Sequence, residues 1–313
     1  MLSITRITTT IEATQSVAWP HFAGSTLRGA FGRAFRKAAC ITGQDKCGGC
    51  PLRNSCAYGV VFDPAAPAQP LHPSFRDGMP RYIVQPPALG ACQLPSGQTQ
   101  NFNLLLLPGT QAHHGLVVHI LRTAVEKELF QPGLFKLLDT QVSQDAVPQS
   151  STLPHMPGND NTTPANANPA KTHITLRWLT PLRLQQQGRP VFKPQQLDAQ
   201  GLVRALLRRQ MQWQQMTDQK PQVPTPNSTP EQQDPLQCAQ TCTLDTRLLQ
   251  WHDIQRHSGT QNQKLPLGGL IGAATLSGPT AAMQTLLPLL QLGERLHIGK
   301  ETVMGLGRYR LSA

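Results

Sequence analysis

Apolar and polar positions follow two periodic patterns that predict two successive units of mixed strand and helix. Alternating positions and short apolar runs predict strands over residues 3–13, 101–108, 173–184, 242–251, 267–277 and 308–311. Helical spacing predicts helices over residues 24–40, 113–129, 197–216 and 280–292. Each half therefore begins with a strand, continues through a helix that carries basic residues and ends in further strands, which is the outline of a βαββαβ repeat.

Two stretches rich in Pro, Asn, Thr, Gln and Ser interrupt these patterns. Residues 144–171 contain almost no periodic apolar positions, and residues 218–235 have the same character. Such stretches bury too little apolar surface to offset the entropy lost on ordering. We therefore expect an N-terminal domain over residues 1–143, a flexible linker over 144–171, and a C-terminal domain over 172–313 that contains 218–235 as a long loop.

The charge balance narrows the class of partner. Lys and Arg number 28 against 17 Asp and Glu, which gives a formal net charge of +11 and favours nucleic acid as a partner over a merely basic surface. No run approaches the ~18 apolar residues that a membrane-spanning helix needs, and the first residues lack the apolar core of a signal peptide. The sequence predicts a cytoplasmic protein that does not associate with membranes.

Four of the seven cysteines stand close together in the sequence, with spacings of six, two and five residues: Cys40, Cys47, Cys50 and Cys56. Thiols this close in a cytosolic chain more often bind a metal than form disulfides. Four thiolates can hold structural Zn²⁺ or a 4Fe–4S cluster equally well. Four uncoordinated thiols are the alternative, and the other three cysteines are isolated.

Glycines and basic residues alternate near the end of the chain, between an apolar helix and a short strand: Gly299, Lys300, Gly305, Gly307 and Arg308. Glycine lacks a Cβ atom and accepts positive φ, so its amide can approach a phosphate closely. Turn geometry alone would require one such glycine and not three. We therefore predict a glycine-rich loop over residues 299–307 that contacts a polyanion, with Lys300 neutralising a phosphate.

The order of these motifs resembles one family. The chain carries Leu-Gly-Gly-Leu at 267–270, Pro-Leu-Leu-Gln-Leu-Gly at 288–293, the glycine-rich loop, and Gly-Ser-Thr-Leu-Arg-Gly-Ala-Phe-Gly-Arg-Ala at 24–34. This series is similar to that of the CRISPR-associated endoribonucleases that process precursor crRNA, within the repeat-associated mysterious protein class. The resemblance is dense over residues 250–311, moderate over 20–60 and thin in between.

The resemblance implies an α+β fold of two ferredoxin-like domains in tandem, here with a cysteine-rich insertion in the first, and RNA held between the domains. It also implies cleavage of CRISPR repeat RNA without a metal or other cofactor for catalysis. In that reaction the 2′-hydroxyl attacks the adjacent phosphate and leaves a 2′,3′-cyclic phosphate. The enzyme then retains the crRNA stem-loop, and other subunits of a CRISPR effector complex are further candidate partners.

Three residues are candidate catalytic groups on this resemblance. His21 lies just before the first helix, where several family members carry a catalytic histidine, and imidazoles as a class suit proton transfer. Arg28 could hold the scissile phosphate, and His257, with its neighbours His252 and Arg256, supplies further acid or base candidates. Each has a structural alternative: His21 as part of a packed turn, and the others as structural or surface residues.

Basic residues at helical spacing on the first helix form a candidate RNA-binding face: Arg33, Arg36 and Lys37. Arg256 and the glycine-rich loop are further RNA-binding candidates. The alternative for the helix is a solvated charged face.

Two other functions compete with RNA cleavage. A non-catalytic RNA-binding subunit of an effector complex would have the same fold without a working acid or base. A DNA-acting enzyme is suggested only by the cysteine spacing, which resembles the 4Fe–4S loop of endonuclease III-type glycosylases. We disfavour that enzyme because the chain lacks a helix-hairpin-helix motif and its catalytic aspartate.

Overall fold

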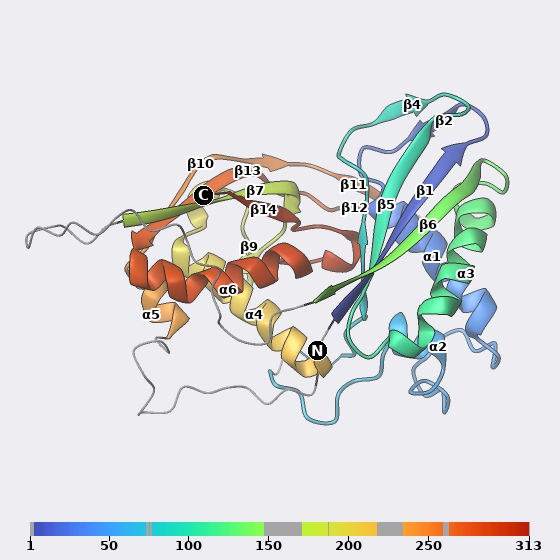
Figure 1. Cartoon of the computed structure of the whole chain (residues 1–313), viewed down its shortest axis with the longest axis horizontal. Coiled ribbons are helices and arrows are strands. Elements are labelled where there is room, and N and C mark those ends of the chain that lie inside the picture. The colour runs from blue at the N-terminus through green and yellow to red at the C-terminus, as the bar shows by residue number, and fades with distance from the viewer. Residues whose placement is uncertain are drawn as a thin grey trace, which may run out of the picture.

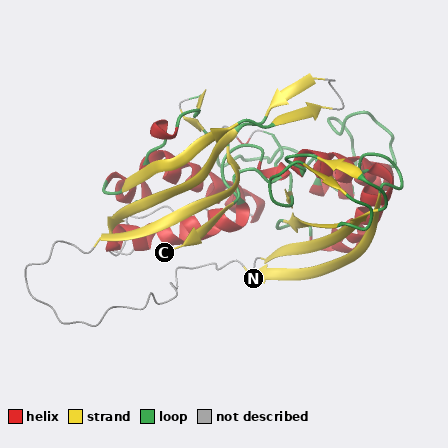
Figure 2. Cartoon of the chain, turned by 90° about the horizontal axis from the view of Figure 1, so that it is seen from above, coloured by secondary structure: helices red, strands yellow, loops and turns green. Residues whose placement is uncertain are grey.

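A computed structural model describes residues 3–72, 75, 77–146, 171–186, 188–217, 234–258 and 263–312. It contains two four-stranded antiparallel sheets, each with its helices on one face (Figures 1 and 2). We call residues 3–146 the first unit and residues 171–312 the second unit. Most of the expected linker, 147–170, and most of the expected long loop, 218–233, lie outside the described residues.

The first unit is built on β1, Ser3–Ala13, which lies between two neighbouring strands. The sheet order is β3-β5-β1-β6, with β3 at Tyr82–Gln85, β5 at Thr99–Leu106 and β6 at Phe135–Ala146. Helices α1, Gly24–Ala39, and α3, His114–Thr123, cover one face, and α3 continues as a π-helical turn, Ala124–Glu128. Alternation along β1 sends Ile7 and Ile11 into the core beneath these helices.

The second unit repeats this arrangement. Its sheet order is β10-β13-β7-β14, with β7 at Lys171–Leu182, β10 at Thr243–His252, β13 at Gly269–Pro279 and β14 at Tyr309–Ser312. Its helices are α4 at Ala199–Thr217, α5 at Pro235–Gln240 and α6 at Thr280–Leu296. In both units the first strand lies between the third and the fourth, which is the ferredoxin-like order, so the predicted α+β tandem is confirmed.

Short strands and one short helix lie outside the two four-stranded sheets. Three pairs of short strands are antiparallel. They are β2, Val17–Trp19, with β4, Cys92–Leu94; β8, Gln185–Gln186, with β9, Arg189–Pro190; and β11, Gln255–Ser258, with β12, Gln263–Pro266. A short helix, α2, spans Ala57–Val61 and follows the cysteine-rich segment. No helix in the described part of the chain has both the length and the hydropathy to cross a bilayer.

Two apolar clusters join the units to one another. In one cluster, Ile83 and Leu105 of the first sheet pack with Trp213 and Leu296 from the helices of the second unit. In the other, Phe22 packs with residues of the second unit: Ile254, Leu267, Met304 and Leu306. The turn before α1 is therefore fixed against the second unit, and the candidate site lies at this junction.

Candidate functional site

Two histidines that are far apart in the sequence meet at the junction of the units. His21 lies in the turn between β2 and α1, and His252 is the last residue of β10. Their Nε2 atoms are 2.7 Å apart, and their ring centroids are 4.9 Å apart. One of these nitrogens must donate a proton while the other accepts it, so the pair combines one proton donor with one acceptor.

The backbone on both sides of this pair is held in place. The His21 carbonyl accepts a hydrogen bond of 3.0 Å from the Gly90 amide. The next residue, Phe22, is buried against Ile254, which follows His252 by two positions. Both histidines remain partly exposed to solvent. The site is therefore anchored by buried neighbours and open to a ligand.

The glycine-rich loop, residues 299–307, packs against the first unit. Its short 3-10 helix, Thr302–Met304, contacts β3 and the start of α1. Gly305 has φ of +91°, and a Cβ atom there would lie 2.4 Å from the Val84 carbonyl oxygen of β3. Gly307 has φ of +71°, and its Cβ would lie 1.8 Å from the Ile298 carbonyl oxygen. These glycines let the loop fit between the units.

The amides of these two glycines are already used within the protein. Gly305 donates to the Thr302 carbonyl and Gly307 donates to the Pro181 carbonyl, each at 2.9 Å. Gly299 and Lys300 are exposed residues, although the Lys300 amide also donates to the Arg183 carbonyl at 2.8 Å. Gly305 and Gly307 thus shape the loop, while RNA contact by the loop stays a prediction.

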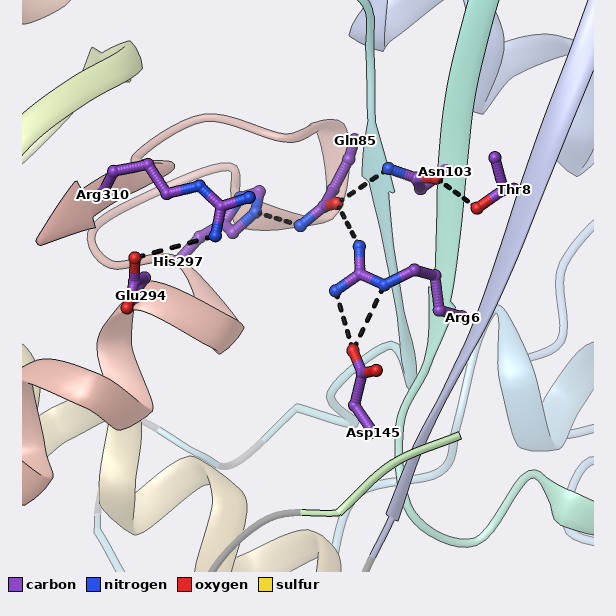
Figure 3. A network of polar contacts seen from close by, with 8 residues as sticks. All are labelled: Arg6, Thr8, Gln85, Asn103, Asp145, Glu294, His297 and Arg310. Atoms are coloured by element: carbon purple, nitrogen blue, oxygen red, sulfur yellow. Dashed lines mark hydrogen bonds and ion pairs between the residues drawn. The ribbon is translucent and has the colours of Figure 1, made fainter. Parts of the chain in front are cut away.

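A chain of polar contacts leads from the first sheet to this loop (Figure 3). Arg6 bonds the Asp145 carboxylate at 2.8 Å and the Gln85 side-chain oxygen at 3.0 Å. The Gln85 side-chain nitrogen lies 3.0 Å from His297 Nε2, and His297 Nδ1 lies 3.3 Å from the Leu306 carbonyl oxygen. Burial holds the pKa of His297 well below its ordinary value, so this histidine is neutral.

Three arginines come together beside this network. Arg6 pairs with Asp145, and Arg310 pairs with Glu294 at 3.7 Å. Burial lowers the pKa of Arg308, and the charges of Arg310 and Arg6 lower it further. Within the described ranges, Arg308 has no carboxylate partner. The junction therefore carries uncompensated positive charge. The sequence analysis did not single out Arg6 or Arg310.

The other predicted catalytic residues are placed differently. The Arg28 guanidinium lies 5.0 Å from the centroid of the Phe62 ring, and no described contact joins Arg28 to His21. His257 and Arg256 lie on β11, but their side chains fall outside the described part of the structure. His252, which the sequence offered with these two as an alternative acid or base candidate, is the residue that meets His21.

The basic face predicted on α1 contacts other parts of the first unit. Arg33 Nε lies 3.0 Å from the Glu128 carboxylate and Lys37 Nζ lies 2.6 Å from it. Bonds from Lys37 and Arg33 lower the pKa of Glu128, although burial opposes them. Arg36 donates to the Gln44 carbonyl. RNA binding by these three residues stays a prediction. Each of them also makes a contact within the first unit.

The four clustered cysteines border one common cavity: Cys40, Cys47, Cys50 and Cys56. In the described ranges, no three His, Cys, Asp or Glu side chains are already grouped as metal ligands. The predicted metal site is therefore not preformed as a ligand cluster in this structure.

Comparison with known families matches two parts of the chain. Residues 2–153 match the family described as AF_1859_N, N-terminal domain. Residues 176–309 match the family described as CRISPR-associated endoribonuclease Cas6. Comparison with curated proteins gave no match.

Several solved structures share this fold at low sequence identity. A Thermus thermophilus Cas6 is 15% identical with a TM-score of 0.52, and 100% of this chain and 99% of that chain are covered. A Cas6 product complex has a TM-score of 0.54 at 15% identity, with 100% of both chains covered. A partial Cas6-RT-Cas1–Cas2 complex has a TM-score of 0.55 at 16% identity, with 100% of this chain covered. The match covers 46% of the length of the matched chain in that partial complex. It covers 29% of the length of the matched chain in the Cas6-RT-Cas1–Cas2 complex.

Proposed function

We propose that this chain, a member of the family of CRISPR-associated endoribonuclease Cas6, cleaves CRISPR repeat RNA at the paired imidazoles of His21 and His252. The observation that carries the proposal is the 2.7 Å contact between their Nε2 atoms, made across the junction of the two units. It supplies a proton donor and a proton acceptor at one partly exposed point.

The proposed reaction needs two proton transfers and no other reactant. His21 Nε2 takes the proton from the 2′-hydroxyl, whose oxygen forms a bond to the adjacent phosphorus. The bond from phosphorus to the 5′-oxygen breaks, and protonated His252 gives its proton to that oxygen. The products are a 2′,3′-cyclic phosphate and a 5′-hydroxyl. Because the two imidazoles supply both transfers, we propose that cleavage requires no metal ion.

Positive charge near the junction supports binding of the RNA backbone. Exposed Lys300 and Arg308, which has no carboxylate partner among the described residues, are the residues that we propose contact phosphates. Phosphate and shape recognition suits a folded repeat with a stem, because such RNA is read largely through its backbone. Retention of the crRNA stem after cleavage, and contacts with effector subunits, belong to the same proposal.

Incubation of the full chain with end-labelled repeat RNA in EDTA tests the proposal. We expect cleavage at one site, a product that ends in a cyclic phosphate, and no cleavage when the nucleotide before that site lacks its 2′-hydroxyl. His21→Ala and His252→Ala should each slow cleavage by roughly 10²–10⁴-fold, with RNA affinity nearly unchanged.

His119→Ala is the matched control, because His119 is exposed on α3. This variant should cleave the RNA at the wild-type rate. Full-rate cleavage by His252→Ala would exclude the paired mechanism. Tight binding without cleavage by the wild-type chain would instead favour a non-catalytic RNA-binding subunit.

A further inference from the structure

The segment between α1 and α2 is folded without a core of its own. We call residues 40–56 the cysteine loop, and none of its residues is buried. Its backbone nevertheless forms consecutive tight turns, with Cys50 bonded to the Cys47 carbonyl at 3.1 Å and Cys56 bonded to the Leu52 carbonyl at 2.7 Å. Segments that bury little apolar surface usually need a cross-link or a metal to hold their shape.

The thiols of this loop approach a common space from two sides. Cys40 Sγ and Cys50 Sγ lie 3.7 Å and 3.8 Å from the same atom, the Thr42 hydroxyl oxygen. Cys47 and Cys56 are packed against the apolar core of the first unit. All four side chains line a single cavity, together with Leu52 and Tyr58. The sulfurs border this cavity without yet converging on one point within it.

Charged side chains of both signs lie near the cavity. Arg53 lines it and is held by the Asp63 carboxylate at 3.0 Å, and Arg36 donates to the Gln44 carbonyl of the loop. Four thiolates around a divalent cation carry a net charge of about −2. Arg36, whose partner is a neutral carbonyl, would offset part of that charge, whereas the charge of Arg53 is already balanced by Asp63.

We propose that Cys40, Cys47, Cys50 and Cys56 form a four-thiolate site for a thiophilic metal centre, either Zn²⁺ or a 4Fe–4S cluster. Binding requires side-chain rotation that turns the four sulfurs into the cavity they already border. Each thiol loses its proton when it binds Zn²⁺ or an assembled 4Fe–4S cluster, and this ligand exchange involves no redox step. The centre would tie the end of α1 to α2 through this loop. The inference does not depend on the proposed RNA cleavage.

Metal analysis of the full chain, purified without oxygen, tests this inference. We expect one zinc per chain, or four irons and four sulfides with thiolate-to-iron absorbance in the visible range. Cys50→Ser should lose most of the metal. Cys92→Ser is the matched control, because Cys92 is exposed and lies outside the cysteine loop, and it should retain the wild-type metal content.

A second measurement covers the case in which Cys50→Ser fails to fold. Titration of the native wild-type chain with a mercurial reagent should release the metal in proportion to the thiols blocked. A wild-type chain that holds no metal after supply of Zn²⁺, or of iron and sulfide under reducing conditions, would overturn the inference. So would a mass that shows the four cysteines joined as two disulfides.

Discussion

The Gln85 side-chain amide binds His297 Nε2 at 3.0 Å, and this buried contact joins the first sheet to the end of α6. His297 has φ of 60° and ψ of 163°, a backbone conformation that glycine adopts far more readily than other residues. The surrounding contacts hold it there, because its Nδ1 meets the Leu306 carbonyl of the glycine-rich loop. Gln85 therefore helps to set the position of the loop against the first unit.

Gln85→Leu tests this relationship. The substitution keeps a side chain of similar size but leaves the His297 Nε2 atom buried without a donor, and it removes the oxygen that accepts from Arg6 and Asn103. We expect the free energy of unfolding to fall by about 1–3 kcal/mol, measured by urea denaturation. Gln141→Leu is the control, because Gln141 is exposed on β6, and it should change the value by less than about 0.5 kcal/mol.

The ionisation of His297 gives a prediction for pH. Its pKa is held well below the ordinary value of 6.5, first by burial and then by the charges of Arg308 and Arg209. The unfolded chain therefore binds a proton below about pH 6.5 that the folded chain does not bind, so the free energy of unfolding falls as the pH drops. Above about pH 6.5 His297 is neutral in both states, and the full stability is present. Below that pH the free energy of unfolding falls by at most about 1.4 kcal/mol per pH unit because of this one histidine.

Urea denaturation of the wild type and of His297→Gln between about pH 5 and pH 8 isolates this residue, because the remaining histidines are common to both chains. The destabilisation caused by His297→Gln should be constant above about pH 7 and should shrink as the pH falls. A difference that does not vary with pH would show that His297 is not the buried neutral group that the structure places there.

Sequence patterns predicted the elements that have a regular period. The strand expected over 3–13 and the helix expected over 24–40 are found at Ser3–Ala13 and Gly24–Ala39. The strand β3 was missed because all four of its residues are buried, so no alternation marks it. The edge strand β6 was also missed, and it extends to Ala146, past the start of the expected linker.

The candidate site was harder to predict for a different reason. His21 and His252 are 231 positions apart, and only the packing of the second unit against the turn before α1 brings their rings together. Local signals placed His21 beside a helix start but could not identify its partner. The glycines of the loop were visible in the sequence, whereas their burial against β3 depends on the contact between the two units.

Gly305→Ala tests the role of the glycine-rich loop as a packing element. Gly305 has φ of +91°, and a Cβ atom would lie 2.4 Å from both the Val84 carbonyl oxygen and Pro86 Cδ. Gly97→Ala is the matched control, because Gly97 has φ of +84° and open space around it. We expect Gly97→Ala to cost about 1 kcal/mol of backbone strain and Gly305→Ala to cost clearly more, measured by thermal and urea unfolding.

An equal loss of stability in the two variants would show that backbone conformation alone requires glycine at 305. If the clash separates the units, Gly305→Ala should also slow the proposed RNA cleavage, because His21 and His252 come from opposite sides of the junction.

Arg308 provides the prediction for RNA binding. Its backbone amide bonds the Thr180 hydroxyl at 2.9 Å and its carbonyl accepts from Leu179 at 2.8 Å, so Arg308→Gln removes the charge and keeps the backbone contacts. If the guanidinium neutralises one phosphate, the slope of log affinity against log salt should become shallower by roughly 0.7. Arg122→Gln, on the exposed surface of α3, should leave the slope unchanged. Filter binding at several salt concentrations measures the slope. If Arg308→Gln has the wild-type slope, Arg308 does not contact a phosphate of the bound RNA.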